Sequence, residues 1–184
     1  MREDASKIEM QPMGNGQDSY LKDLQQRASM DMLSGLLNRA SMERAVKDRL
    51  REMGQGDTCA LFIVDLDNFK QVNDVLGHQA GDQAIRRAAE KLSSLFRASD
   101  IVGRLGGDEF AVFLYGGITE EIASKKAAAI CEKLQLALGD RETVYVTASV
   151  GVHIAGKGQV FEGLYQSADL ALYKAKKPAS TSFI

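Results

Sequence analysis

This 184-residue chain has only two cysteines. It also has no large excess of either charge and no long hydrophobic run. The two cysteines, Cys59 and Cys131, show neither metal-ligand spacing nor a disulfide framework, so we predict two buried thiols. With 23 basic and 25 acidic residues, the net charge of -2 excludes a general attraction to nucleic acid or to an anionic membrane. No stretch is long and apolar enough to cross a bilayer, and the polar start has no signal core. We therefore expect a cytoplasmic chain without membrane insertion, in which an anionic ligand needs a local site.

The remaining composition is typical of a globular protein. Hydrophobic residues make up 45% and charged residues 26% of the chain, which indicates one domain with its own core. Residues 1–18, which include QPMGNGQ, indicate a flexible tail or linker, and residues 19–30 carry a short helical pattern. We expect the domain itself over residues 31–184.

Hydrophobic periodicity predicts alternating strands and helices. Strands are expected at residues 59–65, 101–105, 110–115 and 144–154, and helices at residues 41–53, 68–76, 85–96, 120–138 and 161–177. Ser41 is the expected cap of the first helix, and residues 77–82 are expected to form a loop. From residue 59 onward, the order predicts an α+β fold with a ferredoxin-like or palm-type βαββαβ core, a central antiparallel sheet flanked by helices. In that topology the first two strands are parallel, and the third lies antiparallel between them.

The sequence RLGGDEF, residues 104–110, places two glycines and two acids between strand-like runs. Glycine suits a hairpin turn, but the turn does not require Asp108 and Glu109. The predicted topology puts this turn at the same end of the sheet as Asp65 and Asp67. Such like charges repel unless a cation lies among them or one acid holds a proton. The cluster indicates a Mg²⁺ site for phosphoryl or nucleotidyl transfer, with a solvated acidic rim as the alternative.

Several basic and polar residues could serve such a site. Lys70 and Lys176 would supply positive charge to a polyphosphate, or they lie on the solvated surface. Asn73 and Asp82 carry groups that can read the edge of a base, although helix and loop capping is the alternative. By itself, His78 indicates only a turn residue.

Six segments together resemble one known family. They are DMLSGLLNR at 31–39, VDLDNFKQVND at 64–74, GHQAGD at 77–82, GGDEF at 106–110, TASVG at 147–151 and ADLALYKAK at 168–176. In order and approximate spacing they resemble the GGDEF domain of the diguanylate cyclases, with Ser34 where the family usually has threonine. The resemblance extends from about Asp31 to Lys177.

The resemblance implies that two GTP molecules are condensed into cyclic di-GMP, with release of two pyrophosphates. Each domain of a dimer would present one GTP, and each 3′-oxygen would attack the partner's α-phosphate. The implied cofactor is Mg²⁺, with Mn²⁺ as a substitute. The implied metal ligands are Asp65, the Leu66 carbonyl, Asp108 and Glu109, and the implied catalytic residues are Asp108, Glu109 and Lys70. The implied GTP-binding residues are Asn68, Phe69, Lys70, Asn73, His78, Asp82 and Lys176.

Arg97 and Asp100 match the family's product-inhibition motif, which implies a second site for cyclic di-GMP. Five strand residues separate this pair from the GGDEF turn by roughly 17 Å. The alternative is a local turn in which the two residues pair with each other.

The chain departs from the family pattern after Lys176. Ala179 and Ser180 stand where a glycine and a phosphate-binding arginine are usual. This departure keeps open a second hypothesis, a catalytically silent module that binds GTP or cyclic di-GMP. We expect no phosphodiesterase activity, because the second domain that it needs has no counterpart in the sequence. A longer protein could still be anchored to a membrane through an N-terminal module.

Overall fold

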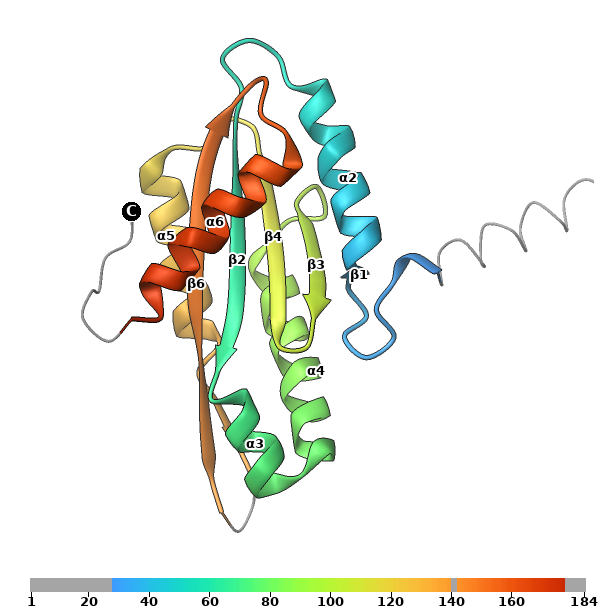
Figure 1. The fold of residues 1–184 in the computed structure, drawn as a ribbon, viewed down its shortest axis with the longest axis vertical. Coiled ribbons are helices and arrows are strands. Elements are labelled where there is room, and N and C mark those ends of the chain that lie inside the picture. Colours follow the sequence, from blue (N-terminus) through green and yellow to red (C-terminus); the bar gives the residue numbers. More distant parts are fainter. Residues whose placement is uncertain (1–27, 140–141, 178–184) are drawn as a thin grey trace, which may run out of the picture.

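A six-stranded sheet forms the middle layer of the computed structural model, which describes residues 28–139 and 142–177 (Figure 1). The strands lie in the order β1-β3-β4-β2-β6-β5. Their bounds are β1 Leu37–Asn38, β2 Thr58–Asp67, β3 Ile101–Gly106, β4 Glu109–Tyr115, β5 Leu136–Leu138 and β6 Val144–Gly156. Strand β4 runs antiparallel to both β2 and β3, so these two strands are parallel to each other, as predicted. The ferredoxin-like core is therefore confirmed, with β1 and β5 added at its edges.

Helices cover both faces of the sheet. Helices α2 (Arg39–Glu52) and α6 (Phe161–Ala175) pack on one face, and α3 (Phe69–Leu76), α4 (His78–Leu95) and α5 (Glu120–Lys133) pack on the other (Figure 1). The central strand β2 is buried on both sides, because Leu61 and Ile63 join the core under α2 and α6. Phe62 and Val64 join the opposite core. Burial on both faces explains the continuous apolar run in the sequence.

The β3–β4 turn lies beside the end of β2. Asp65 pairs in register with Glu109, and the Leu66 main-chain N–H donates to the Asp108 carbonyl at 3.2 Å. Gly106 and Gly107 have φ angles of +144° and +53°, a region that favours glycine. The two glycines thus allow the tight reversal that carries the two acids to the end of the central strand.

One predicted helix is partly a strand. The helix expected at residues 120–138 ends at Lys133, and residues 136–138 form β5 against β6. Leu136 and Leu138 are buried while Ala137 is exposed, which is the period of a strand. Pairing with the exposed edge of β6 outweighs the helical propensity of this short segment.

Other boundaries also differ from the predicted ones. Helix α4 begins at His78, so most of the expected loop at residues 77–82 forms its first turns, and Gly77, with φ +82°, provides the break. The cap of α2 is Asn38, whose side chain accepts from the Ser41 N–H at 3.0 Å, so Ser41 lies inside the helix. Strand β2 continues to Asp67 because β6 pairs with it as far as Thr147. Helix α6 ends at Ala175, two residues earlier than predicted.

Some predictions fall outside the described residues. These are the tail at residues 1–18, most of the helix at residues 19–30, and the departure at Ala179 and Ser180. Cys59 is buried as predicted, and burial raises the pKa of its thiol to about 11. Cys131 is only partly buried, because it lies at the margin of the core under α5. Among the described helices, none is long and apolar enough to cross a membrane.

Candidate active site

The end of β2 and the β3–β4 turn bring carboxylates and an ammonium group together. Asp65 is only 8% exposed and pairs across the strands with Glu109. Asp108 precedes Glu109 and is joined to β2 through its carbonyl. Lys176, which follows α6, places its Nζ 2.6 Å from Oδ1 of Asp65. The structure thus unites Asp65, Asp108 and Glu109 from the predicted metal set with Lys176 from the predicted GTP set.

The electrostatics of this acidic cluster oppose full ionisation. Burial raises the pKa of Asp65, and the charges of Asp108 and Asp67 raise it further, while Lys176 opposes the shift. Burial also raises the pKa of Glu109, and the charges of Asp65 and Asp108 add to the effect. Negative charge is therefore in excess here, so the cluster favours a bound cation or proton.

This raised pKa predicts a pH-dependent effect of Glu109→Gln on stability. Between the ordinary value of 4.5 and the raised value, the folded state binds more protons than the unfolded state, so stability falls as pH rises. We expect Glu109→Gln to raise the melting temperature by a few degrees at neutral pH. The gain should vanish well below pH 4.5, where the wild-type carboxyl is protonated in both states. Thermal unfolding followed by circular dichroism measures the effect, and a gain that is the same at every pH would contradict it.

Asp67, the second acid at the end of β2, is bound by hydroxyl groups of β6. The hydroxyls of Thr147 and Ser149 each donate to one Asp67 oxygen at 2.7 Å. The β3–β4 turn and Asp67 lie at the same end of the sheet, as predicted, and the Asp67 oxygens also tie β2 to β6. The alternation of Thr147 and Ser149 in TASVG could have revealed this contact, because it places both hydroxyls on one face of a strand.

The donor set of the acidic cluster fits a hard divalent cation. Asp65 and Asp108 offer carboxylate oxygens from neighbouring strand ends, and the pKa of Asp65 is raised first by burial and then by the charges of Asp108 and Asp67. Mg²⁺ characteristically takes few protein oxygens when phosphates complete its shell. In the part of the chain that the structure describes, no group of three or more His, Cys, Asp or Glu side chains is arranged to hold a metal ion. The set Asp65, Leu66, Asp108 and Glu109 therefore stays a prediction, with substrate oxygens needed to complete the shell.

The turn from β2 into α3 depends on Asn68. Its φ of +62° is the only positive φ of a non-glycine residue among those described. Asparagine tolerates this left-handed conformation better than most residues. The turn lets α3 begin at Phe69, directly after β2, with the unpaired amides of its first turn next to the strand end. Lys70 is exposed in the first turn of α3, whereas Phe69 packs partly against the core.

Asn73 and Asp82, which were predicted to read guanine, and His78, which was predicted to lie near the nucleotide, lie where α3 meets α4. The side chain of Asn73 packs so closely against Gly81 that a Cβ at this position would collide with Oδ1 of Asn73. His78 and Asp82 are exposed in the first turns of α4. Gly81 thus allows the close approach that fixes Asn73, a role that its place in an expected loop concealed.

The sequence matches a family whose fold is known. The family model described as "Diguanylate cyclase, GGDEF domain" matches residues 28–181. The chain belongs to the GGDEF-domain family. Solved GGDEF structures also resemble the fold described above, which confirms the predicted architecture.

Relatives of this GGDEF domain are parts of longer proteins. The chain is 33% identical over 166 residues to the diguanylate cyclase DgcP of Pseudomonas aeruginosa, covering 86% of this chain and 24% of DgcP. It is 38% identical over 159 residues to the probable diguanylate cyclase DgcC of Escherichia coli K12, and the match covers 84% of this chain and 42% of DgcC. It is 36% identical over 157 residues to the cyclic di-GMP phosphodiesterase NbdA of P. aeruginosa, and the match covers 83% of this chain and 20% of NbdA. The chain therefore spans less than half the length of each of these relatives.

Two solved structures show the same GGDEF fold with a bound ligand or partner protein. The coiled coil and GGDEF domain of DgcB from Caulobacter crescentus, in complex with c-di-GMP, has a TM-score of 0.77 at 28% identity and covers 87% of this chain and 86% of that one. The diguanylate cyclase SiaD of P. aeruginosa, in complex with its activator SiaC, has a TM-score of 0.72 at 33% identity, with coverages of 87% and 62%.

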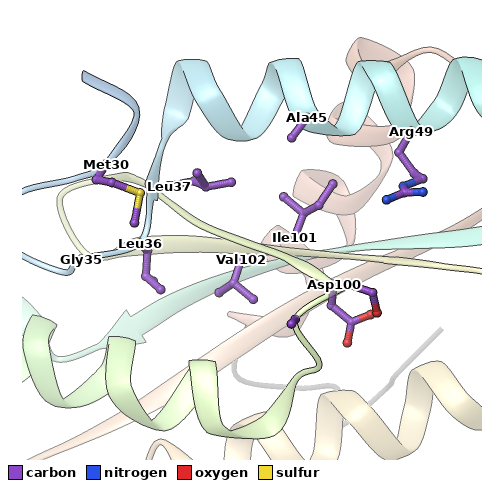
Figure 2. Close-up of a pocket in the computed structure, with 11 residues that line it drawn as sticks. Met30, Gly35, Leu36, Leu37, Ala45, Arg49, Asp100, Ile101 and Val102 are labelled. Atoms are coloured by element: carbon purple, nitrogen blue, oxygen red, sulfur yellow. The ribbon is translucent and has the colours of Figure 1, made fainter. Parts of the chain in front are cut away.

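Arg97 and Asp100 lie at the opposite end of β3 from the GGDEF turn. Oδ2 of Asp100 accepts from the Arg97 main-chain N–H at 2.9 Å, so the local contact uses the main chain of Arg97. A cavity of about 410 Å³ lies between α2, residues 30–37 and the start of β3 (Figure 2). Asp100 lines this cavity, whereas Arg97 and the acidic cluster do not. The two predicted sites of the GGDEF domain are therefore spatially separate.

Two residues of α6 that were not predicted, Tyr165 and Asp169, interact electrostatically with Glu109, and Arg39 of α2 lies against Tyr165. The guanidinium carbon of Arg39 lies 5.6 Å from the ring centre of Tyr165. Burial raises the pKa of Tyr165, and the charge of Glu109 adds to this effect. Asp169 raises the pKa of Glu109 as well. The spacing of Tyr165 and Asp169, four residues apart in a helix, places them on one face and was the signal available in the sequence.

Proposed function

We propose that this GGDEF domain is a diguanylate cyclase that condenses two GTP molecules into cyclic di-GMP and two pyrophosphates. The observation that carries the proposal is the meeting of Asp65, Glu109 and Lys176 at the end of β2, where α3 begins. Crowded carboxylates beside a helix start and a lysine suit a nucleoside triphosphate with its metal ion. The names of DgcP and DgcC support the same activity.

The residues divide the work between binding and chemistry. Lys70, Lys176 and the first amides of α3 hold the phosphates, while Asn73 and Asp82 read guanine and His78 lies near the nucleotide. Asp82 gives selectivity, because guanine offers two adjacent N–H donors that adenine lacks. A bound Mg²⁺ or Mn²⁺ ion would neutralise phosphate charge and activate the attacking oxygen. Asp65, the Leu66 carbonyl and Asp108 would hold that ion, with Glu109 completing the acidic set.

The reaction requires two copies of the domain. In each half-reaction the 3′-oxygen of one GTP forms a bond to the α-phosphorus of the other, and the bond to the β-phosphate breaks as pyrophosphate leaves. The proton of the 3′-hydroxyl passes to the acidic pair, Asp108 and Glu109, at the β3–β4 turn. A domain dimer places the two GTP molecules face to face, so the rate per chain should depend on concentration.

Incubation of the chain with GTP and Mg²⁺ at several protein concentrations tests this function. Chromatography separates cyclic di-GMP from GTP and linear products. We expect product at a rate per chain that rises with concentration until the dimer is saturated. ATP in place of GTP should give no cyclic product. Absence of product even at high concentration, with GTP still bound, would contradict the cyclase.

A regulatory site for the product is the second part of the proposal. Arg97 and Asp100 would bind cyclic di-GMP, the guanidinium through guanine or phosphate acceptors and the carboxylate through guanine donors. Bound product inhibits if it holds two domains in an arrangement that keeps the two GTP molecules apart.

We expect Arg97→Ala to raise the inhibitory concentration of cyclic di-GMP by roughly 10- to 100-fold, the effect of losing one charge-assisted contact. The initial rate without product should not change. Initial rates over a range of added cyclic di-GMP measure the shift, with Arg86→Ala, an exposed arginine on α4, as the matched control. Inhibition of Arg97→Ala at the wild-type concentration would refute the assignment.

A second candidate function is a silent module that binds GTP or cyclic di-GMP. The match to 20% of NbdA, which is named a cyclic di-GMP phosphodiesterase, favours it, because a related domain occurs in a protein named for the opposite activity. Binding of GTP without turnover, measured by calorimetry beside the chromatographic assay, would identify such a module.

A further inference from the structure

One ion pair joins the end of α6 to the end of the central strand β2. Nζ of Lys176 lies 2.6 Å from Oδ1 of Asp65. The Asp65 side chain is 12% exposed, whereas that of Lys176 is 40% exposed. Within the described residues, no other cationic side chain pairs with Asp65. This largely buried carboxylate therefore depends on one lysine for its positive counter-charge.

The fold fixes the backbone of Lys176 but not the position of its ammonium group. The Lys176 N–H donates to the Leu172 carbonyl at 3.0 Å, so residue 176 closes the last turn of α6. Helix α6 itself lies directly on β6, where Gly151 closely approaches the backbone of Leu172. A lysine side chain, by contrast, is a flexible four-carbon stem that presents a point charge. Because this stem is exposed, the ammonium can turn away from Asp65 without a movement of α6.

The pairing has opposite consequences for a divalent cation and for a polyphosphate. Lys176 offsets part of the negative charge of Asp65, so its ammonium repels a cation that binds the same carboxylate. A polyphosphate, in contrast, offers the ammonium several charged oxygens and draws it away from Asp65. Binding of the polyphosphate therefore frees the carboxylate that the cation needs.

We propose that Lys176 is an exchangeable counter-ion, which pairs with Asp65 until phosphate oxygens arrive and then moves to them. The exchange makes the binding of cation and nucleotide cooperative, because either ligand relieves the other of the cost of separating Lys176 from Asp65. The identity of the polyphosphate as GTP rests on the proposed function, whereas the competition between Lys176 and a cation does not.

Titration with Mn²⁺ alone, followed by the electron paramagnetic resonance signal of the free ion, tests the competition without nucleotide. We expect Lys176→Met to bind Mn²⁺ about tenfold more tightly than the wild type, because the repulsion is removed. Lys176→Arg keeps the charge and should bind the ion as weakly as the wild type. Lys174→Met, which removes an exposed positive charge from the last turn of the same helix, is the matched control. Its affinity should change less than about twofold, because salt screens exposed charges.

Three outcomes of this titration would overturn the proposal. One is an affinity of Lys176→Met for Mn²⁺ that is no higher than that of the wild type. Another is an equal gain in Lys174→Met, because it would indicate a general effect of net charge. The third is a gain that persists when Asp65→Asn is added to Lys176→Met, because the ion would then bind elsewhere. All variants should keep the wild-type circular dichroism spectrum.

The affinity for nucleotide provides a second readout, in which the exchange predicts a change of opposite sign. We expect Lys176→Met to bind a fluorescent GTP analogue about tenfold more weakly in the presence of Mg²⁺, since a charge-assisted contact is lost. A merely structural role would lower both affinities. Unchanged nucleotide affinity in Lys176→Met would overturn the transfer to phosphate. A wild-type chain that binds neither GTP nor the analogue would instead refute the proposed function, and the Mn²⁺ titration alone would then decide the competition.

Discussion

Asp108→Asn reduces the formation of cyclic di-GMP by about 100- to 1,000-fold, the range expected when a group that stabilises transition-state charge is lost. Asparagine preserves the size of the side chain. The main-chain carbonyl of residue 108, which accepts from the Leu66 N–H, also stays in place. The substitution removes one negative charge from the acidic cluster, so it should weaken both metal binding and proton uptake. Chromatographic measurement of initial rates at saturating GTP gives the effect.

The control for Asp108→Asn must separate chemistry from folding. The variant should keep the wild-type circular dichroism spectrum and should not lower the melting temperature, because it relieves repulsion with Asp65 and Glu109. Asp48→Asn on α2 serves as the matched loss of a carboxylate away from the site. Turnover of Asp108→Asn at the wild-type rate would contradict the role of the acidic cluster.

Gly151→Ala destabilises the domain by about 3 kcal/mol, because a single methyl group would collide with the backbone of α6. Gly151 pairs with Ile63 in the middle of the sheet. A Cβ there would meet the carbonyl oxygen of Ala168 and the main-chain nitrogen of Leu172, neither of which can move without shifting the helix. Urea unfolding followed by circular dichroism measures the loss.

Gly156→Ala provides a matched control in the same strand. Its added Cβ would lie 3.9 Å from the nearest atom, the Asp57 carbonyl oxygen, which is an ordinary contact. We therefore expect little change in the free energy of unfolding. A shift of α6 in Gly151→Ala should also displace Lys176 from Asp65, so activity should fall even where the variant remains folded. Equal stability of the two variants would show that α6 does not need this close approach.

The architecture could be predicted because its signals are local. Residues 59–64 form one apolar run since β2 is buried on both faces, and the turn at Gly106 and Gly107 needs glycine for its φ angles. Once the order of elements was known, the rules of chain connection placed Asp65 beside Glu109.

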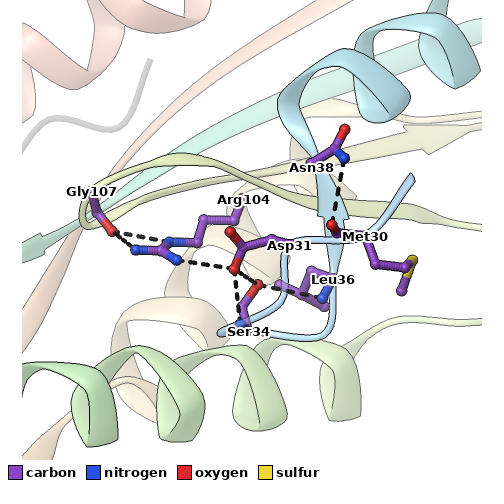
Figure 3. A network of polar contacts seen from close by, with 7 residues as sticks. All are labelled: Met30, Asp31, Ser34, Leu36, Asn38, Arg104 and Gly107. Carbon is purple, nitrogen blue, oxygen red and sulfur yellow. Dashed lines mark hydrogen bonds and ion pairs between the residues drawn. The ribbon is translucent and has the colours of Figure 1, made fainter. Parts of the chain in front are cut away.

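The features that the sequence did not predict depend on contacts between segments that are distant in the chain. Residues 136–138 form β5 because the edge of β6 is available to them, which a local pattern cannot reveal. The sequence pattern identifies Arg104 only as a residue at the end of a predicted strand. Its bonds to Asp31 and Gly107 exist only in the folded chain (Figure 3). The contact of Asp67 with Thr147 likewise joins strands whose contacting residues are 80 positions apart in the sequence.

The position of β2 at the centre of the sheet also governs how the protein must be made. Thr58 pairs with Gly156, and β4 and β6, the two neighbours of β2, both follow it in the chain. During translation, the most apolar strand therefore leaves the ribosome long before its second partner is synthesised. Such long-range pairing folds slowly and leaves apolar surface open to chaperones or aggregation. Because Lys176 comes later still, after α6, a nascent chain that stops before β6 lacks part of the candidate active site.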